Sequence, residues 1–128
     1  LLLISAKNPY YLMSSYRWVP SLREKCPDPE VEIHPQTAHE YGITQGDEVT
    51  VETHWGQIVQ KARLTDRVHP KVVSADLGWW FPEGDPKTQY DWHTSNLNML
   101  TSIHALGKEF GTPNMKNIPC SISKAEQR

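Results

Sequence analysis

The stretch His34–Thr53, which reads HPQTAHEYGITQGDEVTVET, contains the strongest indications of how this chain folds. Pro35 suits the first turn of a helix, because its missing N–H would have no partner there. Gly42 suits the left-handed backbone position that ends a helix. We therefore expect a helix of about two turns from Pro35 to Tyr41. The Gly-Asp pair that follows indicates a turn leading directly into a strand.

The turn at Gly46-Asp47 is expected to be a structural feature rather than a catalytic one. Asp47 can order it by accepting backbone N–H bonds. In the strand after it, residues 48–53, valines occupy one face and polar side chains the other. A hairpin turn at residues 54–56 then leads into residues 57–64, where side chains alternate in the manner of a strand with one buried face.

Short strands and long loops account for the rest of the chain. The further expected strands cover residues 1–4, 31–33, 71–75 and 118–123. Residues 7–29 are expected to form a long ordered loop with a helical turn, and residues 96–106 to hold a short helix. The segment 76–93 carries three of the five tryptophans and is longer than an ordinary connection, which is typical of functional loops. This order of elements predicts a closed or nearly closed β-barrel rather than a parallel α/β sheet.

The length and composition are those of one folded domain. The chain has 128 residues, and its 13 Lys and Arg against 15 Asp and Glu give a formal charge of −2. One hydrophobic core fits this length, so residues 1–128 are expected to form a single domain. The near-neutral charge argues against a nucleic-acid module, and no apolar stretch approaches the roughly 20 residues that span a bilayer. Because the chain starts at Leu1 rather than Met, we expect it to be a fragment or a processed product.

The cysteines and histidines give no sign of a metal or catalytic centre. Cys26 and Cys120 are expected to be independent reduced thiols, since neither belongs to a CxxC pair. None of the six histidines forms an HExxH motif, and no cysteine stands at zinc spacing from any of them. No GxSxG elbow is present either. We therefore predict no catalytic residue and no protein-ligated metal in this chain.

Five ordered motifs together resemble a known family. They lie in residues 14–17, 33–49, 62–70, 78–82 and 95–101. At this spacing they closely resemble the molybdopterin-dinucleotide-binding domain, the C-terminal domain of the dimethyl-sulfoxide-reductase family of molybdenum and tungsten oxidoreductases. The resemblance covers nearly the whole chain and implies a mainly β fold: a six-stranded double-psi β-barrel, aspartate-decarboxylase-like, with short helices. The stretch 78–83 is most similar to the branch that contains thiosulfate and polysulfide reductases, acetylene hydratase and hydroxytransferases.

The resemblance also implies a ligand and partners. In this family the barrel forms one wall of a cavity that holds bis(molybdopterin guanine dinucleotide), and Mo or W is bound through the cofactor and a protein ligand in another domain. The expected partners are the remaining domains of the catalytic subunit and an iron-sulfur electron-transfer subunit, without nucleic acid or direct membrane insertion. Members occur in the bacterial or archaeal cytoplasm or periplasm, and anaerobic respiration is an expected setting.

The chemistry of this dinucleotide suggests which side chains bind its pyrophosphate. A pyrophosphate needs local hydrogen-bond donors rather than a strong positive field. Lys7, Asn8, Ser14 and Ser15 are suitable. Lys7 could equally be a solvated surface charge, and the two serines could bond to their own turn.

Other side chains are candidates for the ring systems. The pterin edge mixes donors and acceptors, which an amide can match, so Asn96 and Asn98 are expected contacts. Asn96 also suits a helix N-cap: chemistry alone favours the cap, whereas the resemblance favours the cofactor. Trp79 is the main candidate for stacking; Trp80 and Phe81 share this possibility, and anchoring of their loop in a hydrophobic cluster is the alternative for all three. Asn114 and Lys116 are further contacts implied by the resemblance, unless they belong to a solvent-facing loop.

Two functions from different classes fit these observations. The first is a cofactor-binding domain of a molybdenum or tungsten oxidoreductase, without turnover of its own. The second is a double-psi barrel that works as a protein-binding adaptor or as a small separate subunit. The motifs at residues 78–80 and 95–98 favour the first function, because an adaptor has no need of them.

Overall fold

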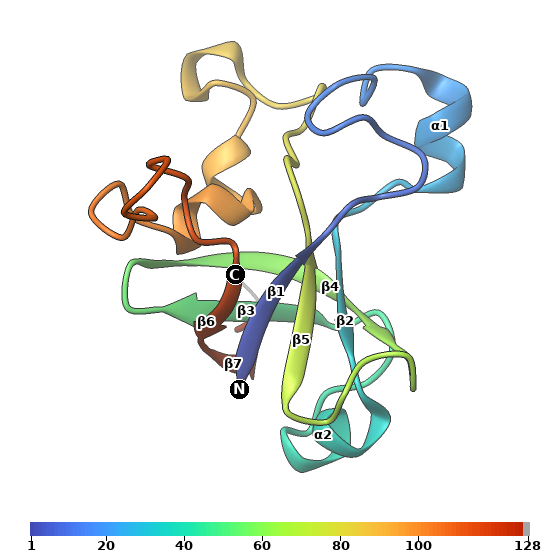
Figure 1. The fold of residues 1–128 in the computed structure, drawn as a ribbon. Helices are drawn as coiled ribbons and strands as arrows, with labels where there is room; N and C mark the ends of the chain where they lie inside the picture. Colours follow the sequence, from blue (N-terminus) through green and yellow to red (C-terminus); the bar gives the residue numbers. More distant parts are fainter. Residues whose placement is uncertain (127–128) are drawn as a thin grey trace.

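The computed structural model describes residues 1–126, which form a mainly β structure with short helices (Figure 1). Seven strands within these residues make one sheet. They are β1 (Leu2–Ala6), β2 (Glu30–Ile33), β3 (Glu48–Thr53), β4 (Gly56–Leu64), β5 (Val72–Asp76), β6 (Lys116–Pro119) and β7 (Ser121–Lys124). The helices are α1 (Pro20–Lys25), α2 (Pro35–Glu40) and the 3₁₀ helices η1 (Pro86–Thr88), η2 (Trp92–Thr94) and η3 (Leu97–Leu100). Among the described residues, no helix has the length and apolar character needed to cross a membrane.

The strands lie where the side-chain patterns predicted them, except near the C-terminal end. The single strand expected over residues 118–123 is two short strands, so the sheet has seven strands rather than six. The segment divides because it pairs on two sides, β6 with β1 and β7 with β3. Cys120 lies between the two and exchanges hydrogen bonds with Leu1, at N–O distances of 3.0 and 3.1 Å.

The sheet is mixed, and its order brings its two ends together. The spatial order is β6-β1-β5-β2-β4-β3-β7. The pairs β1/β5 and β2/β4 are parallel, and the others are antiparallel. β6 and β7 stand at opposite ends of this order, yet only Cys120 separates them in the chain. The ends of the sheet are therefore joined covalently, and Figure 1 shows β6 and β7 next to each other.

Helix α2 forms from the local signals in its sequence. Pro35 occupies its first turn, and the N–H of Gln36 donates to Nδ1 of His34 at 3.1 Å. Gly42 has a φ of +64°, in the left-handed region that glycine favours. The helix ends at Glu40, one residue before the expected end. It covers one end of the sheet, as Figure 1 shows.

The Gly-Asp turn is ordered by the carboxylate of Asp47, as predicted. Its Oδ2 accepts hydrogen bonds from the backbone N–H and the hydroxyl of Thr44, both at 2.8 Å, and pairs with Nζ of Lys124 at 3.0 Å. These interactions, with the Thr44 backbone bond first, lower the pKa of Asp47 from 3.8 to about 2. The turn is thereby connected to β7 as well as to the start of β3.

The hydrophobic core joins all seven strands to α2 and η3. Its buried side chains are Leu3, Val31, Ile33, Ala38, Ile43, Val49, Val51, Ile58, Ala62, Val73, Ala75, Leu97, Leu100, Ile118 and Ile122. The apolar faces that alternation predicted in β3 and β4 are among them. A smaller buried cluster of Tyr11, Cys26 and Trp79 lies under the long loops.

Two loop regions meet at the end of the sheet opposite α2. β1 and β5 are parallel neighbours, with Ala6 opposite Asp76, so the chain leaves both strands at the same end. The segments that follow them, residues 7–29 and 77–96, lie side by side there (Figure 1). Strand direction therefore brings together two loops that are far apart in the sequence.

Candidate functional site

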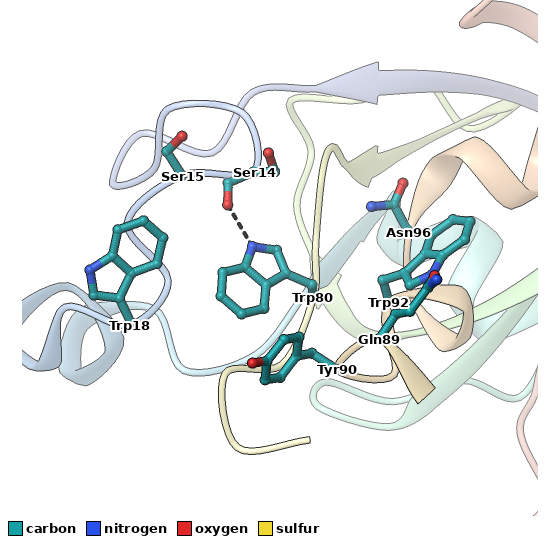
Figure 2. Close-up of a pocket in the computed structure, with 8 residues that line it drawn as sticks. All are labelled: Ser14, Ser15, Trp18, Trp80, Gln89, Tyr90, Trp92 and Asn96. Atoms are coloured by element: carbon teal, nitrogen blue, oxygen red, sulfur yellow. Dashed lines mark hydrogen bonds between the residues drawn. The ribbon is translucent and has the colours of Figure 1, made fainter. Parts of the chain in front are cut away.

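A pocket of about 450 Å³ opens between these two loop regions (Figure 2). Its lining residues are Ser14, Ser15, Trp18, Trp80, Gln89, Tyr90, Trp92 and Asn96. One wall comes from residues 9–19, which follow β1, and the other from residues 77–96, which follow β5. The lining combines hydroxyls, indole and phenol rings and side-chain amides, and it contains no charged side chain.

The two walls touch each other closely. The indole Nε1 of Trp80 donates to the backbone carbonyl of Ser14 at 2.5 Å, the bond drawn in Figure 2. Gly78 has a φ of +74°, and a Cβ added to it would lie 2.9 Å from the carbonyl carbon of Met13. Only glycine allows this approach of two backbones. The wall formed by residues 77–96 therefore fixes the position of the wall formed by residues 9–19, which is called the serine wall below.

Aromatic rings form a continuous row along the pocket. The ring centroids of Tyr16 and Trp18 are 5.9 Å apart, those of Trp18 and Trp80 6.0 Å, and those of Trp80 and Tyr90 5.5 Å. Trp18 remains 57% exposed. Exposed indole faces of this kind can stack on a flat heterocycle.

The wall that carries Tyr90 has an unusual backbone. Gln89, Tyr90 and Asp91 have φ values of +56°, +59° and +53°, three consecutive non-glycine residues in the left-handed region. Each such residue costs of order 1 kcal/mol. Backbone hydrogen bonds hold the segment: the N–H of Tyr90 donates to Asp85, and its carbonyl accepts from Phe81. Strain of this kind is typical of ligand-binding loops, which is consistent with two of the three residues lining the pocket.

Asn96 lines the pocket and also caps η3. Its Oδ1 accepts a hydrogen bond from the N–H of Asn98 at 3.1 Å, and its Nδ2 donates to the carbonyl of Trp79 at 2.9 Å. The amide keeps one N–H and one lone pair for a further partner. The structure thus shows the cap, while contact with the cofactor stays a prediction.

Gln60, in the middle of β4, holds the segment that carries Asn96. Its Nε2 donates to the carbonyls of Ser95 and Asp76 at 2.9 and 3.1 Å, and its Oε1 accepts from the N–H of Asp76 at 3.1 Å. The hydroxyl of Ser95 donates to the carbonyl of Val59 at 2.7 Å. Sequence reasoning did not single out Gln60, although a glutamine on the apolar face of an alternating strand was a usable signal.

Asn8 is half-buried and belongs to a polar cluster rather than to the pocket lining, so its side-chain N–H groups are not available for the expected bond to a pyrophosphate. Its Nδ2 donates to Oδ2 of Asp76 at 3.0 Å and to Sγ of Cys26 at 3.1 Å, so both N–H bonds are used inside the chain. Its Oδ1 accepts from the N–H of Tyr10. Burial raises the pKa of the Asp76 carboxyl and of the Cys26 thiol. Asn8 therefore provides a hydrogen bond to the carboxyl of Asp76, which is buried away from water.

Trp79 is fully buried, so the expectation that it stacks on a ligand is corrected. Its ring packs edge-on against Tyr11, with centroids 5.6 Å apart, and lies 4.5 Å from the guanidinium of Arg17. The alternative, anchoring of the loop in a hydrophobic cluster, is confirmed. Its neighbour Trp80 lines the pocket instead.

The remaining candidates lie outside the pocket lining. Lys7 and Asn98 have exposed side chains. Nζ of Lys116 donates to the carbonyl of Ser5 at 2.6 Å, and Oδ1 of Asn114 accepts from the N–H of Lys116 at 3.2 Å. Lys116 thus lies beside the end of β1, which Lys7 follows directly, Asn114 is bonded to Lys116, and none of the three lines the pocket. Their contacts with a cofactor stay predictions.

Several pocket residues were not among the sequence candidates: Trp18, Gln89, Tyr90 and Trp92. The aromatic content of the long 76–93 segment indicated function, but not which rings face the pocket. Within residues 1–126, His, Cys, Asp and Glu side chains form no group of three or more that could hold a metal ion. Cys26 and Cys120 are free thiols, as expected.

Comparison with known proteins identifies the family. The sequence model described as the molydopterin (molybdopterin) dinucleotide binding domain matches residues 1–119 of this chain. The chain belongs to this family.

Relatives of this molybdopterin-dinucleotide-binding domain are much longer proteins. It is 40% identical over 117 residues to dopamine dehydroxylase of Eggerthella lenta, covering 91% of this chain and 11% of that protein. It is 32% identical over 105 residues to a probable dimethyl sulfoxide reductase chain of Escherichia coli, covering 82% and 13%. The solved structure of acetylene hydratase from Pelobacter acetylenicus matches with a TM-score of 0.90 and 27% identity, over 98% of this domain and 18% of that chain. The domain thus spans less than a fifth of each of these relatives.

The pocket has the donor set that a molybdopterin dinucleotide requires. The hydroxyls of Ser14 and Ser15 can donate to phosphate oxygens without a strong positive field. The remaining N–H and lone pair of Asn96 can meet the mixed edge of a pterin. The indole rings offer apolar faces to bicyclic heterocycles. The residues present therefore fit the group that the family binds.

Proposed function

We propose that the pocket between residues 9–19 and 77–96 is where this domain contacts a molybdopterin guanine dinucleotide. The observation that carries the proposal is the meeting of Ser14, Ser15 and Asn96 with Trp80 in one uncharged pocket. Three of these four residues were selected from the sequence for this ligand. Lys7, Asn98, Asn114 and Lys116, which are exposed, would make only peripheral contacts.

Each part of the lining has a role that follows from its chemistry. The serine hydroxyls donate to the pyrophosphate oxygens, which is possible because the wall that carries them is held in place by Trp80. Trp80 and Trp92 cover the face of a ring and exclude water from it. Asn96 orients the ligand through its unused N–H and lone pair.

The domain is proposed to serve a molybdenum or tungsten oxidoreductase, with other domains supplying the protein ligand to the metal and the substrate site. The metal held by the cofactor supplies the redox chemistry. Relatives named as a dopamine dehydroxylase and a probable dimethyl sulfoxide reductase chain, of which this domain matches 11% and 13%, support this assignment. An iron-sulfur subunit would pass electrons to such an enzyme.

We also propose that the sheet closes as a double-psi β-barrel. Counted as one strand bent at Cys120, β6 and β7 give the six strands that this architecture requires. The covalent link between the two ends of the sheet and the TM-score of 0.90 to the acetylene hydratase structure support closure.

An anaerobic titration with isolated molybdopterin guanine dinucleotide tests the proposed site. Three tryptophans line the pocket, so binding should quench tryptophan emission by energy transfer to the pterin. The double variant Ser14→Ala/Ser15→Ala should weaken binding about tenfold, because about 1.4 kcal/mol of hydrogen-bond energy is lost. GDP and a free pterin, used as separate probes, assign the part of the ligand that the pocket holds.

The matched control is Ser21→Ala/Ser123→Ala, which removes two exposed hydroxyls outside the pocket. Equal affinity of the two double variants would contradict the roles of Ser14 and Ser15. No quenching with any of the probes would reject the pocket as a dinucleotide site and leave a protein-binding adaptor as the function.

A further inference from the structure

Among the residues that the structure describes, Arg17 is the largest charged side chain that is completely buried. Its guanidinium lies between two aromatic rings, with its carbon 4.6 Å from the centroid of Tyr11 and 4.5 Å from that of Trp79. Among residues 1–126, no carboxylate is within ion-pair distance of it. Its charge is therefore compensated by π faces and by backbone carbonyls rather than by an acid.

The two carbonyls that Arg17 binds belong to the two walls of the pocket. Nη1 donates to the carbonyl of Met13 at 2.8 Å, and Nη2 donates to the carbonyl of Leu77 at 3.2 Å. Met13 immediately precedes Ser14, and Leu77 immediately precedes the Gly78–Trp80 segment. One rigid guanidinium thus joins the two walls, at the residue before Ser14 in one and three residues before Trp80 in the other.

The serine wall needs this support because its backbone is strained. Met13 and Tyr16, on either side of the two serines, have φ values of +54° and +73°. Non-glycine residues keep such conformations only where surrounding contacts hold them. Backbone bonds within the segment, from Ser15 to Leu12 and from Val19 to Tyr16, hold its turn. Two further contacts tie it to the rest of the domain: the Arg17 bond to the Met13 carbonyl and the Trp80 bond to the Ser14 carbonyl.

We propose that Arg17 is a positioning residue that sets the separation between the serine wall and the Trp80 wall, and thereby the affinity for the cofactor. The proposal rests on the proposed function of the pocket. Arg17 itself is buried behind the walls and does not line the pocket. Lysine cannot replace it, because an ammonium group lacks the planar fork that donates to two carbonyls while it stacks on two rings.

The test compares Arg17→Lys with Arg23→Lys in the 128-residue chain. Arg23 is the matched control, because its guanidinium is also near Trp79, at 5.6 Å, but binds the side chain of Glu83 instead of a wall carbonyl. Two quantities are measured: the affinity for molybdopterin guanine dinucleotide, and hydrogen exchange of the Trp80 indole N–H by NMR, assigned with Trp80→Phe. Arg17→Lys should weaken binding about tenfold and accelerate that exchange at least about tenfold. Arg23→Lys should change both less than about twofold.

A second pair of variants covers the case in which Arg17→Lys does not fold. Tyr11→Leu removes one ring of the sandwich and should accelerate Trp80 exchange in the same way, whereas Tyr11→Phe keeps the ring and should not. A merely structural Arg17 would lower the unfolding midpoint of Arg17→Lys and leave the Trp80 exchange rate of the folded protein unchanged.

The outcomes separate this proposal from the function on which it rests. If the wild-type chain binds the cofactor, and Arg17→Lys binds it equally well with unchanged Trp80 exchange, the positioning role is overturned and the pocket assignment stands. If the wild-type chain binds no cofactor, the pocket assignment fails, and so does the claim that Arg17 controls the affinity for the cofactor. The Trp80 exchange rates then still decide whether Arg17 holds the two walls together.

Discussion

Asp47 and Asn96 show how a single polar side chain fixes a turn in this domain. Each accepts a backbone N–H close in sequence, from Thr44 and Asn98 respectively, and each then makes one longer-range contact. For Asp47 that contact is Lys124 on β7, and for Asn96 it is the carbonyl of Trp79. In each case one side chain both orders its local turn and ties that turn to a distant segment, so substitutions at these residues should affect both.

Asp47→Asn should destabilise the domain at neutral pH and lose that effect in acid. The folded pKa of about 2 lies below the unfolded value of 3.8, so the ionised carboxylate favours the folded state. Its contribution is complete above about pH 4 and disappears as the pH falls toward 2. Thermal unfolding of both proteins from pH 7 to pH 2 measures this. Glu48→Gln, which removes the neighbouring exposed charge, is the control, and an equal shift in both variants would refute the specific role of Asp47.

Asn96→Ala should lower both stability and affinity for the cofactor. The substitution removes the η3 cap and leaves the buried carbonyl of Trp79 without its donor, which together should cost about 1–3 kcal/mol. Urea unfolding measures the loss. Asn98→Ala, an exposed amide two residues later, should cost less than about 0.5 kcal/mol.

A separate variant distinguishes the cap from the ligand contact. Asn96→Ser keeps a cap acceptor but removes the amide, so it should recover part of the stability and none of the affinity. Full recovery of binding by serine would show that Asn96 acts only through the cap.

At the scale of the element, the pocket depends on two loops that leave parallel strands at the same end of the sheet. The two walls approach each other at Gly78, where the backbone of one wall lies against the backbone of the other. Gly42, after α2, also has a positive φ, but a Cβ there would have nothing within 4 Å. Gly42 is therefore required only for its backbone conformation, whereas Gly78 is required both for its conformation and for close packing, and the two can be compared directly.

Gly78→Ala should destabilise the domain more than Gly42→Ala and should also disturb the pocket. Both variants place a Cβ in the left-handed region, at a cost of about 1–2 kcal/mol. Only at Gly78 does the new Cβ meet backbone atoms, 2.9 Å from the carbonyl carbon of Met13. Chemical unfolding gives the stabilities, and the cofactor titration gives the affinities. Equal losses of stability with unchanged binding by Gly78→Ala would mean that the serine wall adapts freely.

The elements were more predictable from the sequence than the site was. Helix α2, the Gly-Asp turn and the central strands depend on neighbouring residues, such as Pro35, Gly42 and the alternation in residues 57–64, so local patterns located them. The pocket depends on which strands are parallel neighbours, and no local pattern carries that information. Sequence reasoning therefore found Ser14, but between the stacking candidates Trp79 and Trp80 it placed Trp79 in the site, because adjacent residues face opposite ways and only the tertiary fold decides which is buried.

At the scale of the whole molecule, the covalent link through Cys120 should make the stability of distant strands interdependent. β7 pairs with β3 at one end of the sheet order and β6 pairs with β1 at the other, with one residue between β6 and β7. The core side chains Ile118 and Ile122 come from these two strands. A defect in one should therefore reach strands that it does not contact.

Ile122→Ala should destabilise the whole sheet by about 2–5 kcal/mol, as expected for a cavity in a buried site. Native-state hydrogen exchange should show equal losses of protection in β3, which pairs with β7, and in β1, which does not. The neighbouring exposed residue gives the control Ser123→Ala, with an expected change below about 0.5 kcal/mol. Protection lost in β3 alone would show that the two ends unfold independently.

The single-residue link between β6 and β7 also has a consequence during protein synthesis. Within this domain β1 leaves the ribosome before the other strands, and β1 and β3 acquire their outer neighbours only when residues 116–124 emerge. Until then both strands present unpaired edges, and the core lacks the two isoleucines of the closing segment. A nascent chain that stalls before residue 116 is thus a substrate for chaperones and for edge-to-edge aggregation, even though every residue that lines the pocket has already been made.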